Sequence, residues 1–219
     1  MKPYCDAEYI YIDTIKSLEH HIQQIQTLNI SCLGLNTETT GLNYYTDRLR
    51  LIQIAIPDYP VLVIDWFAVA SDRARALINS LLGDRTITKI GHYLKFECCF
   101  LQVNGIQLVE PLFDTYLVYR TMKAGLKVGL KLEQLAAHFL CVTLNKEQQK
   151  SNFAGDLLPE QIQYAANDSR IVLDIRQVLL VNLELFEYRH LHQVFQLENN
   201  CLIDIAQIEL NGVYVNLER

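Results

Sequence analysis

Three apolar segments separated by short polar connections constrain the fold of this chain more than any other feature. The segments are CLGLNTE (32–38), LRLIQIAI (49–56) and VLVIDW (61–66). Each has the apolar run or the alternation that is typical of a β-strand. The connections TTGLNYYTDR and PDYP contain turn-forming residues. We therefore predict an antiparallel meander of three strands.

Helical patterns dominate the rest of the chain. Further strands are expected at 7–13 and 86–92, and Thr14 and Pro159 stand where helices are predicted to begin. The expected helices cover 14–28, 71–84, 93–105, 112–122, 129–140 and 158–186. Because the strands come early and the helices late, we predict an α+β fold, or a mixed α/β sheet with helices packed on it. The final segment, 192–219, reads as a helix, a glycine turn and the start of a strand.

Composition supports one globular domain. The chain has 219 residues, of which 50% are hydrophobic and 20% charged, enough to bury a full core. The net charge is −6, yet residues 114–150 contain six Lys or Arg against three acids. This segment fits either a face that contacts phosphates or an ordinary solvated surface.

Location and redox state follow from the same composition. No run of eighteen apolar residues is present, and the start of the chain lacks the apolar core of a signal peptide. We therefore expect no membrane association and a cytoplasmic protein. The six cysteines lack paired metal-ligand spacing, so we expect reduced thiols that mainly fill the core.

Oxygen-bearing side chains on separate elements form the candidate site. Asn36 and Glu38 end a predicted strand, Glu97 lies on a helix, and Tyr164 and Asp168 lie one helical turn apart. A pair of Mg²⁺ or Mn²⁺ ions needs such hard ligands from several rigid elements, and could activate water at a phosphodiester. Each residue alone is more commonly structural: a lone helical Asp lies at the surface, and a lone helical Tyr in the core.

Four motifs, taken together, resemble a known family. The stretches LGLNTETTGL…RLRLIQIA, IGHYLKFECCFL, LFDTYLVYR and YAANDSRIVLDI look like the motifs of DEDDy 3′–5′ exonucleases. These are the ribonuclease-D-like enzymes and the proofreading domains of family A DNA polymerases. The resemblance covers roughly residues 28–185. It implies a ribonuclease-H-like sheet of about five strands, the first three antiparallel.

The resemblance also implies roles for individual residues. Glu38 and Asp168 match metal ligands that take part in catalysis, and Tyr164 matches the tyrosine that aligns the attacking water. The positions matching the ligands of two Mg²⁺ or Mn²⁺ ions are Asn36, Glu38, Glu97 and Asp168. The positions matching substrate contacts are Thr39, Leu42, His92 and Lys95. Asp114 is read as structural support, and His92 is as readily explained as a core histidine.

Two positions depart from the family pattern. The first-motif aspartate is Asn36, which removes one negative charge where two dications should bind. The second-motif aspartate is Glu97, which keeps the charge on a longer side chain. Three interpretations of Asn36 stay open: a deliberate inactivating substitution, natural decay into a silent binding module, or a weakly active site.

The expected substrate is the single-stranded or frayed 3′ end of DNA, with RNA as the alternative. Aromatic stacking candidates are Tyr44, Tyr45 and Tyr93, and Lys146 is expected to contact a phosphate. Arg48 and Arg50 share one strand face, for which solvation is the default explanation.

The predicted function is thus metal-dependent 3′–5′ exonuclease activity, impaired by Asn36. The alternative is a catalytically silent nucleic-acid-binding or scaffold module. We expect residues 1–190 to form the exonuclease-like domain. Residues 191–219 would form a C-terminal helix and the start of a polymerase-like linker, with a polymerase domain as a partner.

Overall fold

A six-stranded mixed sheet forms the centre of the molecule. The structure is a computed structural model that describes residues 1–185 and 188–216. The strand order is β2-β5-β4-β3-β6-β7. The strands are β2 (Tyr9–Ile12), β3 (Cys32–Thr39), β4 (Leu49–Ile56), β5 (Tyr59–Asp65), β6 (Thr88–Gly91) and β7 (Leu112–Asp114). β3, β4 and β5 are antiparallel to one another, and β2, β6 and β7 pair in parallel with β5, β3 and β6. The predicted mixed sheet and meander are confirmed, with six strands where about five were expected.

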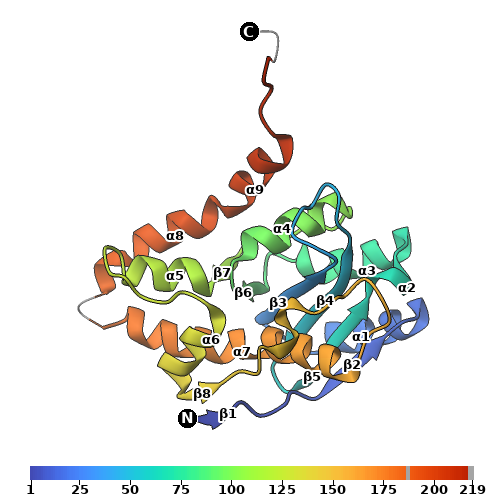
Figure 1. The fold of residues 1–219 in the computed structure, drawn as a ribbon, viewed down its shortest axis with the longest axis horizontal. Helices are drawn as coiled ribbons and strands as arrows, with labels where there is room; N and C mark the ends of the chain where they lie inside the picture. The colour runs from blue at the N-terminus through green and yellow to red at the C-terminus, as the bar shows by residue number, and fades with distance from the viewer. Residues whose placement is uncertain (186–187, 217–219) are drawn as a thin grey trace.

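Helices cover both faces of this sheet (Figure 1). One face packs on α1 (Ile15–Thr27), α2 (Trp66–Val69), α3 (Asp72–Leu82) and α4 (Leu94–Val103). The other packs on α5 (Thr115–Met122), α6 (Leu132–Leu135), a π-helical turn (Ala136–Leu140) and α7 (Pro159–Leu183). A 3₁₀ turn, Glu147–Lys150, precedes α7, and β1 (Lys2–Pro3) pairs with β8 (Val142–Thr143) in a separate two-stranded sheet. The core therefore has two layers, one on each side of the sheet.

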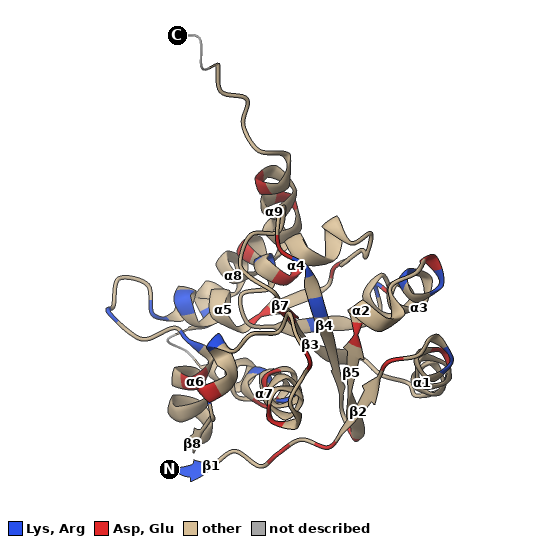
Figure 2. Ribbon diagram, turned by 45° about the vertical axis from the view of Figure 1, so that its right-hand side comes forward, with Lys and Arg blue, Asp and Glu red and all other residues tan. Residues whose placement is uncertain are grey.

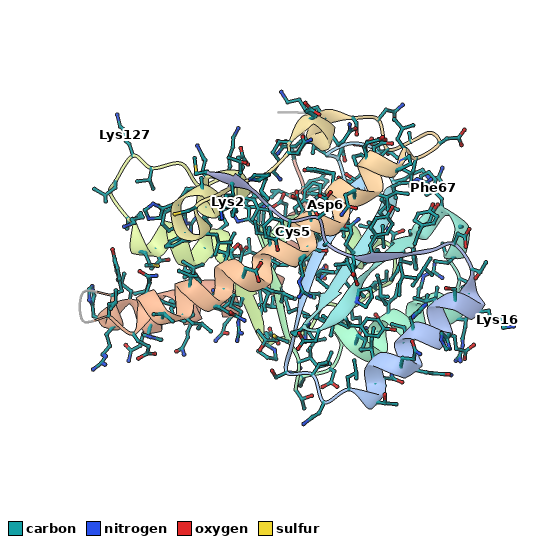
Figure 3. All side chains as sticks on the ribbon, turned by 90° about the horizontal axis from the view of Figure 1, so that it is seen from below. Lys2, Cys5, Asp6, Lys16, Phe67 and Lys127 are labelled. Carbon is teal, nitrogen blue, oxygen red and sulfur yellow. The ribbon has the colours of Figure 1, made fainter. Side chains whose placement is uncertain are left out.

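The long helix α7 runs diagonally across the sheet (Figure 3) and approaches β3 closely at Gly34. A Cβ atom on Gly34 would lie 2.2 Å from the backbone oxygen of Ser169. Because glycine has no Cβ, the two backbones can meet at this point. The contact brings the end of β3 next to the middle of α7.

The C-terminal segment forms two helices, α8 (His192–Asn200) and α9 (Leu202–Asn211), after a short 3₁₀ turn (Arg189–Leu191). They pack along α5 and α4, and the chain after them leaves the body of the molecule (Figure 1). The expected single helix is thus divided at Cys201. The strand expected after Gly212 is not formed over 213–216, and these residues pair with none of the strands in the described part of the chain. Residues 217–219, and Phe186 at the end of the helix expected at 158–186, lie outside the described residues.

Two local expectations are corrected. Residues 112–114, expected to be helical, form β7, and α5 begins only after Asp114, whose carboxylate caps its N-terminus. Arg50 is not solvated: it is buried against Asp65, with Nη1 2.5 Å from Oδ1. Arg48 is exposed, as expected, and both guanidinium groups lie over the ring of Phe67.

The six cysteines are free thiols, but the core-filling interpretation holds for only some of them. Cys98 and Cys99 are buried on α4, and Cys5 and Cys141 are exposed. In the described part of the chain, no helix combines the length and the apolar character needed to cross a bilayer.

Candidate active site

The predicted metal-site residues line a single cleft of about 560 Å³. β3 supplies Asn36 and Glu38, which point to the same face because they are two positions apart. Helix α7 supplies Tyr164 and Asp168 from successive turns. α4 supplies Glu97 from its first turn. The close approach at Gly34 explains why residues so distant in sequence share one cleft.

Lys146 forms an ion pair with Asp168 in the wall of the cleft. Its Nζ lies 2.9 Å from Oδ1 and 2.6 Å from Oδ2 of Asp168, and 3.5 Å from the hydroxyl of Tyr164. The side chains of Lys146 and Asp168 are 16% and 8% exposed, so water screens this pair weakly. Lys146, which is expected to contact a phosphate, thus binds the candidate catalytic carboxylate of Asp168.

Asn36 is held by a partner that sequence reasoning missed. Its Nδ2 donates to Oε1 of Gln53 at 2.9 Å and to Oε1 of Glu38 at 3.4 Å. Gln53 is the cross-strand partner of Asn36 in β4 and is fully buried. The available signal was a lone amide inside the otherwise apolar run LIQIAI. Side-chain amides can flip, so Gln53 could donate to an oxygen at position 36.

The carboxylates of the cleft are in an environment that opposes their ionisation. Burial, followed by the charge of Asp168, raises the pKa of Glu38 to about 8. Burial also raises the pKa of Asp168, although Lys146 opposes this shift. Glu97 is 5% exposed, its Oε2 has no hydrogen-bond partner among the described residues, and burial raises its pKa well above the ordinary value. Acids brought together in this way favour a cation.

The other residues that were predicted to contact the substrate lie in two places. Thr39, Leu42 and His92 line the cleft, and Leu42 is 82% exposed. Lys95 does not line it: its Nζ forms an ion pair with Glu209 of α9. Tyr44 also donates to Glu209, at 2.6 Å, and Tyr45 donates to backbone oxygens of α9. The expected stacking residues Tyr44 and Tyr45 are therefore engaged by the C-terminal helix.

His92 is held as a neutral imidazole at the cleft wall. Its Nδ1 lies 2.9 Å from the hydroxyl of Thr115, and that hydroxyl donates to the backbone oxygen of Gly91 at 2.9 Å. Burial, followed by the charge of Lys146, lowers the pKa of His92 to about 4.

Asp114 has the structural role expected for it. Its buried carboxylate accepts from the backbone N–H groups of Tyr93 and Tyr116 at 2.9 Å and of Leu94 at 2.8 Å. It therefore fixes the starts of both α4 and α5.

The candidate metal ligands are chemically suited to a hard divalent cation, because each of them offers a side-chain oxygen. The unpartnered Oε2 of Glu97 supports this fit. The set is not assembled around one point, however: within residues 1–185 and 188–216, no three His, Cys, Asp or Glu side chains are placed to hold one ion. Asn36 withholds one carboxylate, and Lys146 occupies both oxygens of Asp168.

Comparison with known proteins identifies the family of this chain. Residues 9–184 match the 3′–5′ exonuclease family. The chain is 23% identical to DNA polymerase I of Borreliella burgdorferi over 97% of its own length and 24% of that protein. It is 28% identical to ribonuclease D of Haemophilus influenzae over 68% of its length and 36% of that protein. The chain thus spans only about a quarter to a third of these relatives.

A solved structure shows the same fold. Brucella melitensis NrnC bound to pGG superposes with a TM-score of 0.77 at 24% identity, covering 95% of both chains. This likeness establishes the ribonuclease-H-like fold. Family members hydrolyse phosphodiester bonds and generally use divalent metal ions. Because the family match covers most of the chain and includes every element that lines the cleft, the chain belongs to the 3′–5′ exonuclease family.

Proposed function

We propose that this chain is a metal-dependent 3′–5′ exonuclease that acts on the 3′ end of single-stranded oligonucleotides, at a rate reduced by Asn36. The observation that carries the proposal is the gathering of Glu38, Glu97, Tyr164 and Asp168 in one cleft. The same cleft is lined by Lys131, Lys146 and Lys150, which are suited to the phosphates of the strand.

Each side chain has a proposed task. Glu38 and Asp168 would hold Mg²⁺ or Mn²⁺ ions, with Asn36 and Glu97 completing the set. The Tyr164 hydroxyl would orient the attacking water. Bound ions would lower the pKa of that water and stabilise the leaving oxygen. The neutral imidazole of His92 and the exposed Leu42 would contact the last nucleotide.

Charge explains the reduced rate. An amide at position 36 removes one negative charge, and the ammonium of Lys146 neutralises another at Asp168. Two dications therefore meet weaker attraction than four carboxylates would give. A phosphate of the substrate would compete for Lys146 and free Asp168 for the metal.

Whether the substrate is DNA or RNA is a separate part of the proposal. The overlap with a DNA polymerase I relative along 97% of the chain supports DNA, which is the substrate expected from the motifs. The ribonuclease D relative and the NrnC structure bound to pGG support RNA or short oligonucleotides. A polymerase domain on the same polypeptide is a proposal supported by the first relative.

The decisive experiment restores the missing carboxylate. We expect Asn36→Asp, incubated with Mn²⁺ and a 5′-labelled single strand, to produce a ladder shortened from the 3′ end. The rate should exceed that of the unsubstituted chain by at least about tenfold, because losing even a residue that supports a metal ligand typically costs about 10–100-fold in activity. Matched DNA and RNA strands identify the sugar, and Asn36→Asp/Asp168→Asn is the inactive control. Inertness of Asn36→Asp on both strands would reject the enzymatic proposal.

A second candidate function is a silent nucleic-acid-binding module. The Lys146–Asp168 ion pair favours it, because it satisfies the buried carboxylate without a metal. In that case both the unsubstituted chain and Asn36→Asp should bind the labelled strand, and neither should shorten it.

A further inference from the structure

A second cavity of about 300 Å³ lies next to the junction of β6 and α4, which also borders the cleft. His92, Phe96 and Glu97 line the cleft, whereas the intervening Tyr93 and Lys95 line the second cavity. The start of α5 and the C-terminal helices complete its wall, through Tyr116, Arg120, Glu198 and Ile205. The two cavities therefore flank the same β6–α4 junction.

Two tyrosines form an aromatic pair in this cavity. The ring of Tyr93 is 5.2 Å from that of Tyr116 at an interplanar angle of 84°, and Tyr93 is 45% exposed. Tyr93 adopts a left-handed backbone, with φ of 70°, which is costly for a residue other than glycine. The carboxylate of Asp114 enforces this conformation by accepting from the N–H groups of both tyrosines. Such strain is characteristic of functional sites, where it holds a side chain in place.

Basic side chains stand on either side of the pair, and both are bound to glutamates of the C-terminal helices. Lys95 pairs with Glu209, and Arg120 pairs with Glu198 at 2.8 Å. Figure 2 shows acidic positions on α8 beside the basic positions on α5, and α9 packs on α4, the helix that carries Lys95. The four side chains are 28% to 47% exposed, and ion pairs of such exposure contribute little to stability. Phosphates can therefore replace the glutamates at low cost.

We propose that Tyr93, supported by Tyr116, is a nucleobase-binding subsite, with Lys95 and Arg120 as contacts for the phosphates beside that base. The bound group is an upstream nucleotide of the strand whose 3′ end lies in the cleft, so the inference rests on the proposed function and extends it. Glu198 and Glu209 occupy the two cations until the strand displaces them.

The test measures how binding depends on strand length. Fluorescence anisotropy without metal compares a labelled dinucleotide, which fills the cleft alone, with a seven-nucleotide strand. We expect the longer strand to bind more tightly, and we expect Tyr93→Asn to reduce the ratio of the two affinities about tenfold, the scale of one lost base stack. Asparagine tolerates the left-handed backbone, so this variant removes the ring without adding strain.

Matched variants separate the possible outcomes. Tyr93→Phe keeps the ring and should keep the ratio, as should Tyr214→Asn, which removes a tyrosine that is 92% exposed on the C-terminal extension. Glu198→Gln combined with Glu209→Gln should tighten binding of the longer strand severalfold. An unchanged ratio in Tyr93→Asn would overturn the subsite while leaving the proposed function intact. Failure of the unsubstituted chain to bind either strand would reject the proposed function, and the subsite with it.

Discussion

At the scale of single residues, the sequence identified the members of the cleft but not their partners. Asn36, Glu38, Glu97, Tyr164 and Asp168 were assigned from motifs, and all five line one cleft. The amide of Gln53 and the carboxylate of Glu209 were missed. The lone amide in LIQIAI was the only signal for Gln53. The contact of Glu209 with Lys95 depends on packing between elements that are distant in sequence, so spacing along the chain carries no signal for it.

The acid cluster makes stability depend on pH. The pKa of Glu38 rises from 4.5 to about 8 on folding, so the folded chain retains a proton that the unfolded chain releases between these values. The free energy of unfolding should therefore fall as pH rises through this window, by at most about 1.4 kcal/mol per pH unit. We expect Glu38→Gln to flatten this dependence in urea denaturation with EDTA. An equal slope in both proteins would contradict the assignment.

The Lys146–Asp168 pair gives a second prediction. Removing the ammonium by Lys146→Ala leaves a buried carboxylate without its counter-charge, which should destabilise the chain by about 3 kcal/mol in EDTA. Mn²⁺ should restore much of this loss, because the freed carboxylate can then bind the ion. Thermal denaturation with and without Mn²⁺ measures both effects, and Lys150→Ala, an exposed lysine of the same cleft, is the control. An equal loss of stability in Lys146→Ala and Lys150→Ala would contradict a stabilising role of the Lys146–Asp168 ion pair.

At the scale of elements, long periodic segments were predicted well and short ones were not. LRLIQIAI forms β4 over the predicted residues, and Thr14 and Pro159 begin α1 and α7 as expected. β7 has three residues, and β1 and β8 have two each. Such short strands exist because a neighbouring strand pairs with them, and they lack a pattern of their own.

The meeting of β3 and α7 can be tested at Gly34. An added Cβ would lie 2.2 Å from the Ser169 oxygen and 3.2 Å from Cγ2 of Val172, so Gly34→Ala must push the two elements apart. We expect a loss of about 1–3 kcal/mol of stability, measured by urea denaturation, together with lower strand binding. Gly155→Ala, where an added Cβ meets nothing within 4 Å, should change stability by less than about 0.5 kcal/mol. If Gly34→Ala leaves the stability unchanged, the close approach of β3 and α7 is not required for folding.

At the scale of the whole molecule, charge is distributed unevenly. The net charge is −6, yet the cleft is lined by Lys131, Lys146 and Lys150, and further basic residues lie on α5 and the loop after it, where Figure 3 labels Lys127. An acidic body with one basic wall can bind nucleic acid locally. The sequence indicated this basic segment, but only the fold places part of it at the cleft.

This distribution predicts a shallow salt dependence of strand binding. Two or three phosphate contacts at the lysines of the cleft should contribute about −2 to the slope of log K against log salt, and contacts at Lys95 and Arg120 add to it. The double variant Lys131→Gln/Lys150→Gln should reduce the magnitude of the slope by about one. Titrations between about 50 and 200 mM KCl measure it. A slope near zero would exclude phosphate contact at this wall.

The central claim is that the cleft is a metal site weakened by Asn36, and Mn²⁺ binding tests it most directly. Electron paramagnetic resonance titrations count the bound ions without requiring activity. We expect Asn36→Asp to bind two Mn²⁺ per chain, at least about tenfold more tightly than the unsubstituted chain, and Asp168→Asn to abolish the gain. Absence of Mn²⁺ binding by Asn36→Asp at millimolar concentrations, or binding that Asp168→Asn leaves unchanged, would contradict the account.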